Sequence, residues 1–180
     1  MTVRKIVIAA VLSAIAILLG VTRLGYIPVP TAAGNATIMH VPVIIGGIME
    51  GWGVGLIIGL IFGVSSFLNA TVPLFKDPLV AILPRLFIGI VAYLSYVGLR
   101  RTNEYVAVGV SAFLGSITNT ILVLGMAAIR SYMTWGVAAG VALTNGIPEA
   151  IVAVIITLAV VTAWKQIGKG KKSKISDISK

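Results

Sequence analysis

The sequence predicts an all-α membrane protein, a bundle of six transmembrane helices with both termini in the cytoplasm. Hydrophobic residues make up 58% of the 180-residue chain and charged residues only 11%, and the mean hydropathy is +1.08. A soluble domain of this size needs more polar side chains to cover its surface. The composition therefore disfavours a soluble enzyme, a disordered chain and a secreted disulfide scaffold.

The predicted helices follow from six apolar runs separated by charged or turn-forming residues. The first run carries no charge and, with its flanks, is long enough to cross a hydrocarbon core of about 30 Å. Arg4 and Lys5 before it, and the small residues 31–34 after it, also resemble a secretory signal. Because everything downstream is membrane-like as well, we interpret this run as an uncleaved helix. The runs comprise residues 6–22, 41–49, 51–75, 86–99, 105–129 and 131–148, the last continuing as 150–164.

The second predicted helix allows an alternative. The segment 35–49 is short for a span and contains Pro42, and the sequence 50–53 is typical of a tight turn. A re-entrant second segment is therefore possible, as are seven spans with a re-entrant piece. The fourth helix is expected to begin near Pro78 or Leu79, because proline lacks an amide hydrogen that the first turn would leave unpaired.

Lysine and arginine residues are concentrated on one side of this six-span topology. Only Arg23, Lys76 and Arg130 fall in the loops of the opposite side. Cytoplasmic loops of membrane proteins are enriched in basic residues, so both termini are predicted to face the cytoplasm. Residues 1–165 then form one six-helix membrane domain, and residues 166–180 form a basic cytoplasmic tail. The residues on the cytoplasmic side are Arg4, Lys5, Arg100, Arg101, Lys165, Lys169, Lys171, Lys172, Lys174 and Lys180.

Several function classes lack the residues they need. The chain has no cysteine, which excludes thiol catalysis and cysteine-bound metals. It has no Gly-x-x-x-x-Gly-Lys-Ser/Thr loop, so an ATP-driven role needs a partner protein. His40 is the single histidine and cannot build a zinc site by itself. We therefore expect neither an enzyme nor a bound cofactor or metal. The net charge of +9 is explained by the membrane topology and does not indicate nucleic acid binding.

Ionisable residues inside the membrane are costly, so each one is a candidate functional residue. Arg85, within the fourth span, needs a carboxylate or phosphate, which a ligand could supply, or the protein through Asp77 or Glu149. Snorkelling to the interface is the structural alternative, because the outer end of this helix is close to water. Glu149 follows Pro148 inside the last span, where it either bonds a ligand hydroxyl or amide or pairs with Arg85.

Two asparagines and the first outer loop complete the candidate site. Asn119 and Asn145 are amides in apolar runs, and they either bind polar groups of a ligand or join helices by hydrogen bonds. The loop 23–40, which contains Asn35 and ends at His40, has the length and the flexible residues of a lid over a pocket. A plain connector explains this loop equally well.

Small residues recur at every fourth position on two of the predicted helices. Ala10 and Ala14 form such a stripe on the first helix, on which another helix can pack closely. A longer glycine stripe on the third helix predicts close packing inside the bundle. Its members are Gly51, Gly55, Gly59 and Gly63.

Four segments together carry a resemblance to a known family. They are TIMHVPVIIG (37–46), DPLVAILPR (77–85), TNT (118–120) and NGIPE (145–149). The chain resembles, over nearly its whole length, the substrate-binding S component of energy-coupling factor (ECF) transporters, the vitamin uptake systems of bacteria. The resemblance implies a multi-pass protein of the bacterial plasma membrane that captures a vitamin on its outer face and delivers it inward.

The resemblance also implies partners and a pocket. A transmembrane coupling protein and two ABC-type ATPases would supply the energy, and Ala10 and Ala14, which match the family's Ala-x-x-x-Ala motif, would meet the coupling protein. The family's pocket is built from the outer loops and the outer halves of the last three helices. The substrate-binding candidates are Arg85, Asn119, Asn145, Glu149, Asn35 and His40.

The pattern is most similar to the pantothenate-type branch of the family, and Arg85 suits the single carboxylate of pantothenate. Hydroxymethylpyrimidine, riboflavin, folate and cobalamin are alternatives within the same family. An ion-coupled secondary transporter or a channel is the alternative outside it.

Overall fold

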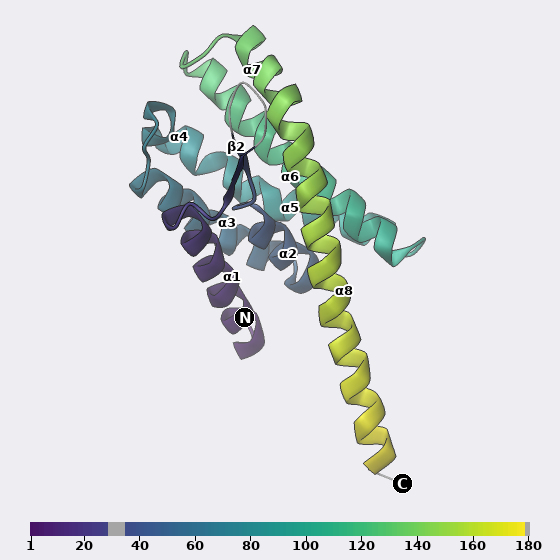
Figure 1. Cartoon of the computed structure of the whole chain (residues 1–180). Coiled ribbons are helices and arrows are strands. Elements are labelled where there is room, and N and C mark those ends of the chain that lie inside the picture. The colour runs from purple at the N-terminus through teal and green to yellow at the C-terminus, as the bar shows by residue number, and fades with distance from the viewer. Residues whose placement is uncertain (29–34, 179–180) are drawn as a thin grey trace.

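The computed structural model describes the backbone of residues 1–28 and 35–178, and side chains within 1–26 and 37–167. Helices build almost all of it, and one short antiparallel hairpin pairs Tyr26 with Thr37. The start of α1 and the end of α8 lie at the same end of the molecule (Figure 1). The elements are α1 (Val3–Val21), β1 (Tyr26–Pro28), β2 (Asn35–Thr37), α2 (Val41–Glu50), α3 (Trp52–Leu68), η1 (Pro73–Lys76), α4 (Pro78–Ala81), α5 (Leu83–Leu99), α6 (Glu104–Ile129), α7 (Trp135–Val141), the π-helical η2 (Ala142–Gly146) and α8 (Ile147–Ile178).

The all-helical membrane class is confirmed, whereas the count of six spans stays a prediction. Within the described residues, four stretches are long and apolar enough to cross a membrane. The helix α2 has ten residues and covers about 15 Å, half of a bilayer core. The backbone of α8 also continues to Ile178, past the boundary predicted at residue 165. The four stretches are Val3–Val21, Pro78–Leu99, Glu104–Ile129 and Trp135–Ile167.

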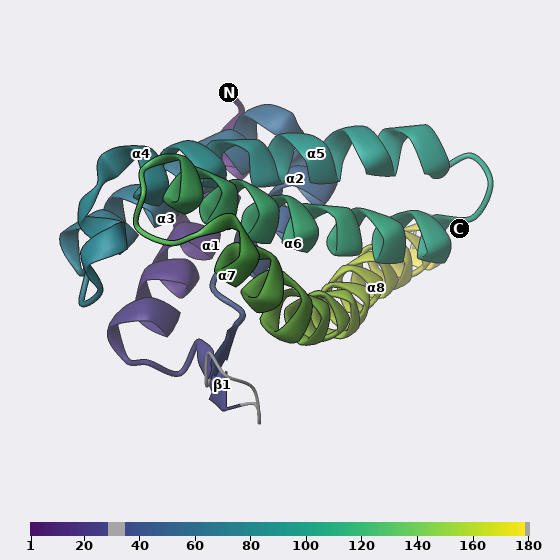
Figure 2. The same cartoon turned by 90° about the horizontal axis from the view of Figure 1, so that it is seen from above.

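The short helix α2 forms the centre of the bundle. Every residue from Val41 to Ile48 is buried, and α2 packs against α1, α3, α5, α6 and α8. Large apolar side chains such as Leu94, Ile121 and Ile155 are exposed on the outer helices, as expected of surfaces that face lipid. The run 41–49 therefore belongs to the core of the bundle and not to a surface that faces lipid. Seen from above, α5 and α6 lie side by side (Figure 2).

The predicted turn between the second and third helices is confirmed. Gly51 joins α2 to α3 with φ at +103°, a conformation that residues with a side chain rarely adopt. The chain therefore reverses here within a single residue that lies outside both helices.

Three members of the glycine stripe, Gly55, Gly59 and Gly63, are buried inside the bundle on α3, as predicted, whereas Gly51 lies just before the helix. A Cβ atom on Gly55 would lie 2.8 Å from the Cα of Gly89 on α5, and one on Gly89 would lie 2.5 Å from the Cα of Gly55. A Cβ on Gly59 would collide with the carbonyl oxygen of Arg85. The backbones of α3 and α5 are thus in direct contact, which requires glycine at these positions.

An ion pair near η1 joins the start of α4 to the residue that follows α6. The helix α4 begins at Pro78, as predicted, and Asp77 caps it, because its carboxylate accepts from the Leu79 amide at 3.0 Å. Arg130, just after α6, donates through Nε to Asp77 Oδ2 at 2.6 Å. The hydrogen bond from Arg130 holds the pKa of the Asp77 carboxyl below its usual value. The start of α4 is thereby tied to the end of α6.

We predict that Gly89→Ala destabilises the protein by about 1–3 kcal/mol, because the added methyl group forces α3 and α5 apart. Gly98→Ala is the matched control on the same helix, since a Cβ there meets nothing within 4 Å. Thermal unfolding of the two variants in detergent measures the difference. Equal midpoints for both variants would contradict the contact between α3 and α5.

We predict that Asp77→Asn lowers the thermal unfolding midpoint at neutral pH, since it removes the ion pair while asparagine can still cap α4. The pKa of Asp77 is lowered in the folded state, so its stabilisation is fully present above the unfolded pKa of about 3.9 and is lost as the pH falls through the folded value. The difference between wild type and variant should therefore shrink in acid. A difference that stays constant from neutral pH to about pH 3 would show that the charge of Asp77 is not the cause.

Candidate functional site

A cavity of about 680 Å³ opens at the end of the bundle that carries the β-hairpin, η1 and η2. We call it the hairpin cavity. Its size falls within the range of small-molecule sites, and residues of α1, α3, α5, α6 and α8 line it together with the hairpin. Four predicted site residues, which are far apart in sequence, line this one cavity: Arg85, Asn119, Asn145 and Glu149.

Arg85 is buried in the wall of the hairpin cavity, and only 4% of it is exposed. Pro84 has no amide hydrogen to donate to the carbonyl of Val80, four residues earlier. Arg85 Nη1 donates to that carbonyl instead, at 2.5 Å. The guanidinium carbon also lies 5.6 Å and 5.0 Å from the ring centroids of Phe62 and Phe75. The guanidinium is therefore held inside the protein, and the snorkelling alternative is wrong.

Neither carboxylate considered as a partner for Arg85 forms an ion pair with it. Asp77 binds Arg130, and Glu149 is engaged by the hairpin. Arg85 forms no ion pair with any acid whose side chain the structure describes, and its Nε has no hydrogen-bond partner there. A buried charge without a counter-ion is costly, so this part of the cavity favours an anionic group.

Glu149 connects the hairpin to the last helix. Its Oε1 accepts from the Thr37 amide at 2.8 Å and from Thr37 Oγ1 at 3.1 Å. The strand β2, which contains Thr37, also contacts α8 and η2. The predicted pairing of Glu149 with Arg85 is thus not formed, and the carboxylate holds the first outer loop at the edge of the cavity instead.

The two asparagines reach the cavity from α6 and from η2. Asn119 is buried, and its Oδ1 has no partner among the described side chains and backbone. Asn145 lies in the π-helical turn that precedes Pro148, whose missing amide hydrogen leaves the carbonyl of Thr144 without its usual helical donor. A Cβ on Gly146 would lie 2.9 Å from Thr120 Cγ2, so η2 and α6 are in close contact beside both asparagines.

His40 and Asn35 are placed differently from the other candidates. The His40 side chain is completely buried, shares a hydrogen bond of 3.0 Å with Ser116 Oγ, and does not line the cavity. It packs behind the wall, next to the start of α2. The backbone of Asn35 pairs with Pro28 in the hairpin, but its side chain lies outside the described residues.

Sequence reasoning missed several lining residues. Phe62, Phe75 and Thr37 were not selected, because aromatic and hydroxyl side chains in apolar runs or loops carry no signal that separates them from ordinary packing. No group of three or more histidine, aspartate or glutamate side chains within the described part of the chain is arranged to hold a metal ion. Among the described residues that line it, the hairpin cavity therefore offers polar groups for recognition by charge and hydrogen bonds: the guanidiniums of Arg23 and Arg85, the carboxylate of Glu149, and the amides of Asn69, Asn119 and Asn145.

Comparison with known proteins identifies the family. Residues 4–161 match the family model described as "ECF transporter, substrate-specific component". The chain is also 34% identical, over 152 residues that cover 71% of this chain and 76% of the relative, to the pantothenic acid transporter PanT of Lactococcus lactis subsp. cremoris (strain MG1363). The match includes all the described residues that line the hairpin cavity. The chain therefore belongs to the substrate-specific components of ECF transporters, which are transport proteins and not enzymes.

Proposed function

We propose that this protein is the S component of an ECF importer for pantothenate, and that the Arg85 guanidinium binds the pantothenate carboxylate. The observation that carries the proposal is a buried arginine that lines the hairpin cavity and has no carboxylate partner among the described side chains. The similarity to a protein named as a pantothenic acid transporter supports the same ligand.

The polar groups around Arg85 suit the remainder of the pantothenate molecule. Its hydroxyls and amide need donors and acceptors of the kind that Asn119, Thr120 and Asn145 provide along the cavity wall. Riboflavin and hydroxymethylpyrimidine carry no carboxylate and would leave Arg85 unpaired. Cobalamin is much larger than a cavity of about 680 Å³ can enclose. Folate would bring a second carboxylate, whereas the second cation that lines the cavity, Arg23, is exposed to solvent.

The proposed orientation places the hairpin cavity on the outer side of the membrane. The six apolar segments then alternate across the bilayer, with α2 contributing a short, buried segment. Basic side chains gather at the end that carries the start of α1 and the end of α5, as the rule for cytoplasmic loops requires.

Docking to the energy-coupling partners is assigned to the outward face of α1. Ala9, Ser13 and Ala16 face the bundle and are buried, whereas Ala10 and Ala14 are exposed. Small exposed residues four positions apart let a second helix approach closely. The coupling protein would pack there, and its two ATPases would supply the energy that this chain, lacking a P-loop, cannot.

Arg85→Gln should reduce the affinity for pantothenate by about 10- to 150-fold, because a hydrogen bond to a charged group contributes about 1.5–3 kcal/mol. Isothermal titration of the purified protein measures this loss. Pantothenol, in which an alcohol replaces the carboxylate, is the matched ligand: wild type should discriminate strongly between the two ligands, and the variant should not. If the variant still preferred pantothenate by the same factor, Arg85 would not bind the carboxylate.

Ala10→Trp combined with Ala14→Trp should abolish pantothenate uptake by cells that produce the complete transporter, while the isolated variant binds pantothenate normally. The indole rings would keep the coupling protein away from α1 without touching the hairpin cavity, which begins at Ala16 on this helix. Ala163→Trp, at an exposed alanine of α8, is the control and should leave uptake intact. If the control variant lost uptake to the same extent as the double variant, the result would contradict a docking role for Ala10 and Ala14.

A further inference from the structure

A second cavity, of about 620 Å³, lies at the opposite end of the bundle, and we call it the terminal cavity. Four helices, α1, α3, α5 and α8, contribute residues to the walls of both cavities. On α5, Arg85 lines the hairpin cavity and Arg100, next to the last turn, lines the terminal cavity; on α8 the corresponding residues are Glu149 and Lys165. These residues are about 22–24 Å apart along the helix axes. The terminal cavity therefore lies near the other surface of a bilayer core of about 30 Å.

Basic side chains dominate the wall of the terminal cavity. Arg4 and Lys5 reach it from α1, Arg100 from the end of α5, and Lys165 from α8. Glu50 is the acidic residue in this wall, and it forms an ion pair of 2.8 Å with Arg4. Glu104, which is not part of the wall, pairs with Lys165. Two of the four cations therefore have a carboxylate partner, and the charge of the other two attracts an anion.

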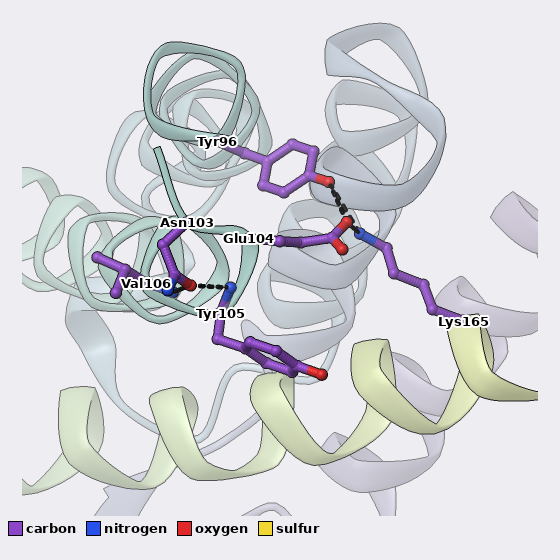
Figure 3. Close-up of polar contacts among 6 residues, drawn as sticks. All are labelled: Tyr96, Asn103, Glu104, Tyr105, Val106 and Lys165. Atoms are coloured by element: carbon purple, nitrogen blue, oxygen red, sulfur yellow. Dashed lines mark hydrogen bonds and ion pairs between the residues drawn. The ribbon is translucent and has the colours of Figure 1, made fainter. Parts of the chain in front are cut away.

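The side chain of Lys165 is held in place by a small polar cluster. Figure 3 shows Lys165 reaching from α8 toward Tyr96 and Glu104. Its Nζ donates to Tyr96 Oη at 2.8 Å and forms an ion pair with Glu104, and Tyr96 Oη donates to Glu104 at 3.2 Å. Asn103 caps the helix that begins at Glu104, accepting from two amides of its first turn. This cluster fixes one wall of the terminal cavity at the junction of α5, α6 and α8.

Two cations of the terminal cavity are not neutralised in this way. Lys5 and Arg100 form no ion pair with a carboxylate among the side chains that the structure describes. They line the cavity from different helices, so a single anionic group between them could accept hydrogen bonds from both.

The aromatic residues that line the terminal cavity indicate that it lies at the level of the lipid headgroups. Trp52 and Trp164 line it and are 56% and 49% exposed, and Tyr93 and Tyr96 line it from α5. Tryptophan and tyrosine concentrate at the level of lipid headgroups. The wall also includes apolar side chains, among them Ile57 and Val97, which a free inorganic anion would not need.

We propose that the terminal cavity binds the headgroup of an anionic phospholipid, whose phosphate oxygens accept hydrogen bonds from Arg100 and Lys5. The acyl chains would follow exposed apolar side chains of α1 that lie about 100° around the helix from Ala10 and Ala14, namely Val11 and Ile15. Anionic lipids are enriched in the cytoplasmic leaflet, which matches the predicted side of both termini. The proposal requires only that the chain spans a membrane, and it does not depend on which ligand fills the hairpin cavity.

Native mass spectrometry of the full-length protein, titrated in neutral detergent with phosphatidylglycerol or phosphatidylcholine, tests this site. Wild type should bind one phosphatidylglycerol in preference to phosphatidylcholine. Lys5→Gln with Arg100→Gln should weaken phosphatidylglycerol binding by about tenfold or more, since two charge-assisted hydrogen bonds are lost. Lys76→Gln with Arg101→Gln removes the same two charge types from exposed positions outside the cavity and should leave the affinity unchanged within about twofold.

Three outcomes would overturn the proposal. The first is equal binding of the two lipids by wild type, and the second is an equal loss in both double variants, which would indicate a general effect of surface charge. The third is full displacement of phosphatidylglycerol by inorganic phosphate at similar concentration, which would assign the cavity to a soluble anion. Pantothenate binding by the same variants, measured in parallel, reports whether they fold correctly. If wild type did not bind pantothenate, that result would contradict only the function proposed for the hairpin cavity.

Discussion

The direct contact between the backbones of α3 and α5 determines where the candidate site can form. Gly55 and Gly89 leave no room for a Cβ atom between the two helices, and Gly59 lies against the backbone of Arg85 itself. In a bilayer, helices gain little from hiding apolar surface from one another, so such close packing is a main source of attraction between them. The same contact carries Arg85 to the wall of the hairpin cavity, so the packing that stabilises the bundle also positions its most costly charge.

Two prolines act on the backbone beside the functional side chains. Pro84 leaves the Val80 carbonyl without its usual helical donor, and the guanidinium of Arg85 uses that carbonyl. Pro148 stands immediately before Glu149 and just after the π-helical turn that contains Asn145. A proline in a spanning helix therefore has the same consequence twice: it opens the regular hydrogen-bond pattern at the point where a polar side chain enters the cavity.

The sequence alone predicts which residues are unusual but not which of them meet. Arg85 and Glu149 stand out because charged side chains in apolar runs are rare and costly, and the structure brings both to one cavity. Their partners could not be deduced, because Glu149 binds Thr37, a residue of the hairpin that lies 112 positions away in the sequence. The burial of α2 could not be predicted either, because a short apolar run has the same composition whether it faces lipid or the protein core.

In the function proposed above, two different carboxylates have separate roles: Glu149 of the protein holds the hairpin, and the carboxylate of the ligand binds Arg85. Had Glu149 paired with Arg85, an incoming carboxylate would have to break a buried ion pair, and removing one partner of such a pair costs about 3–5 kcal/mol. Instead Glu149 holds the hairpin, while Arg85 rests on a neutral carbonyl and two aromatic faces. These contacts are weaker than a charged partner would be. An anionic ligand can therefore gain most of the energy of a buried ion pair at Arg85 without first releasing the hairpin that borders the cavity.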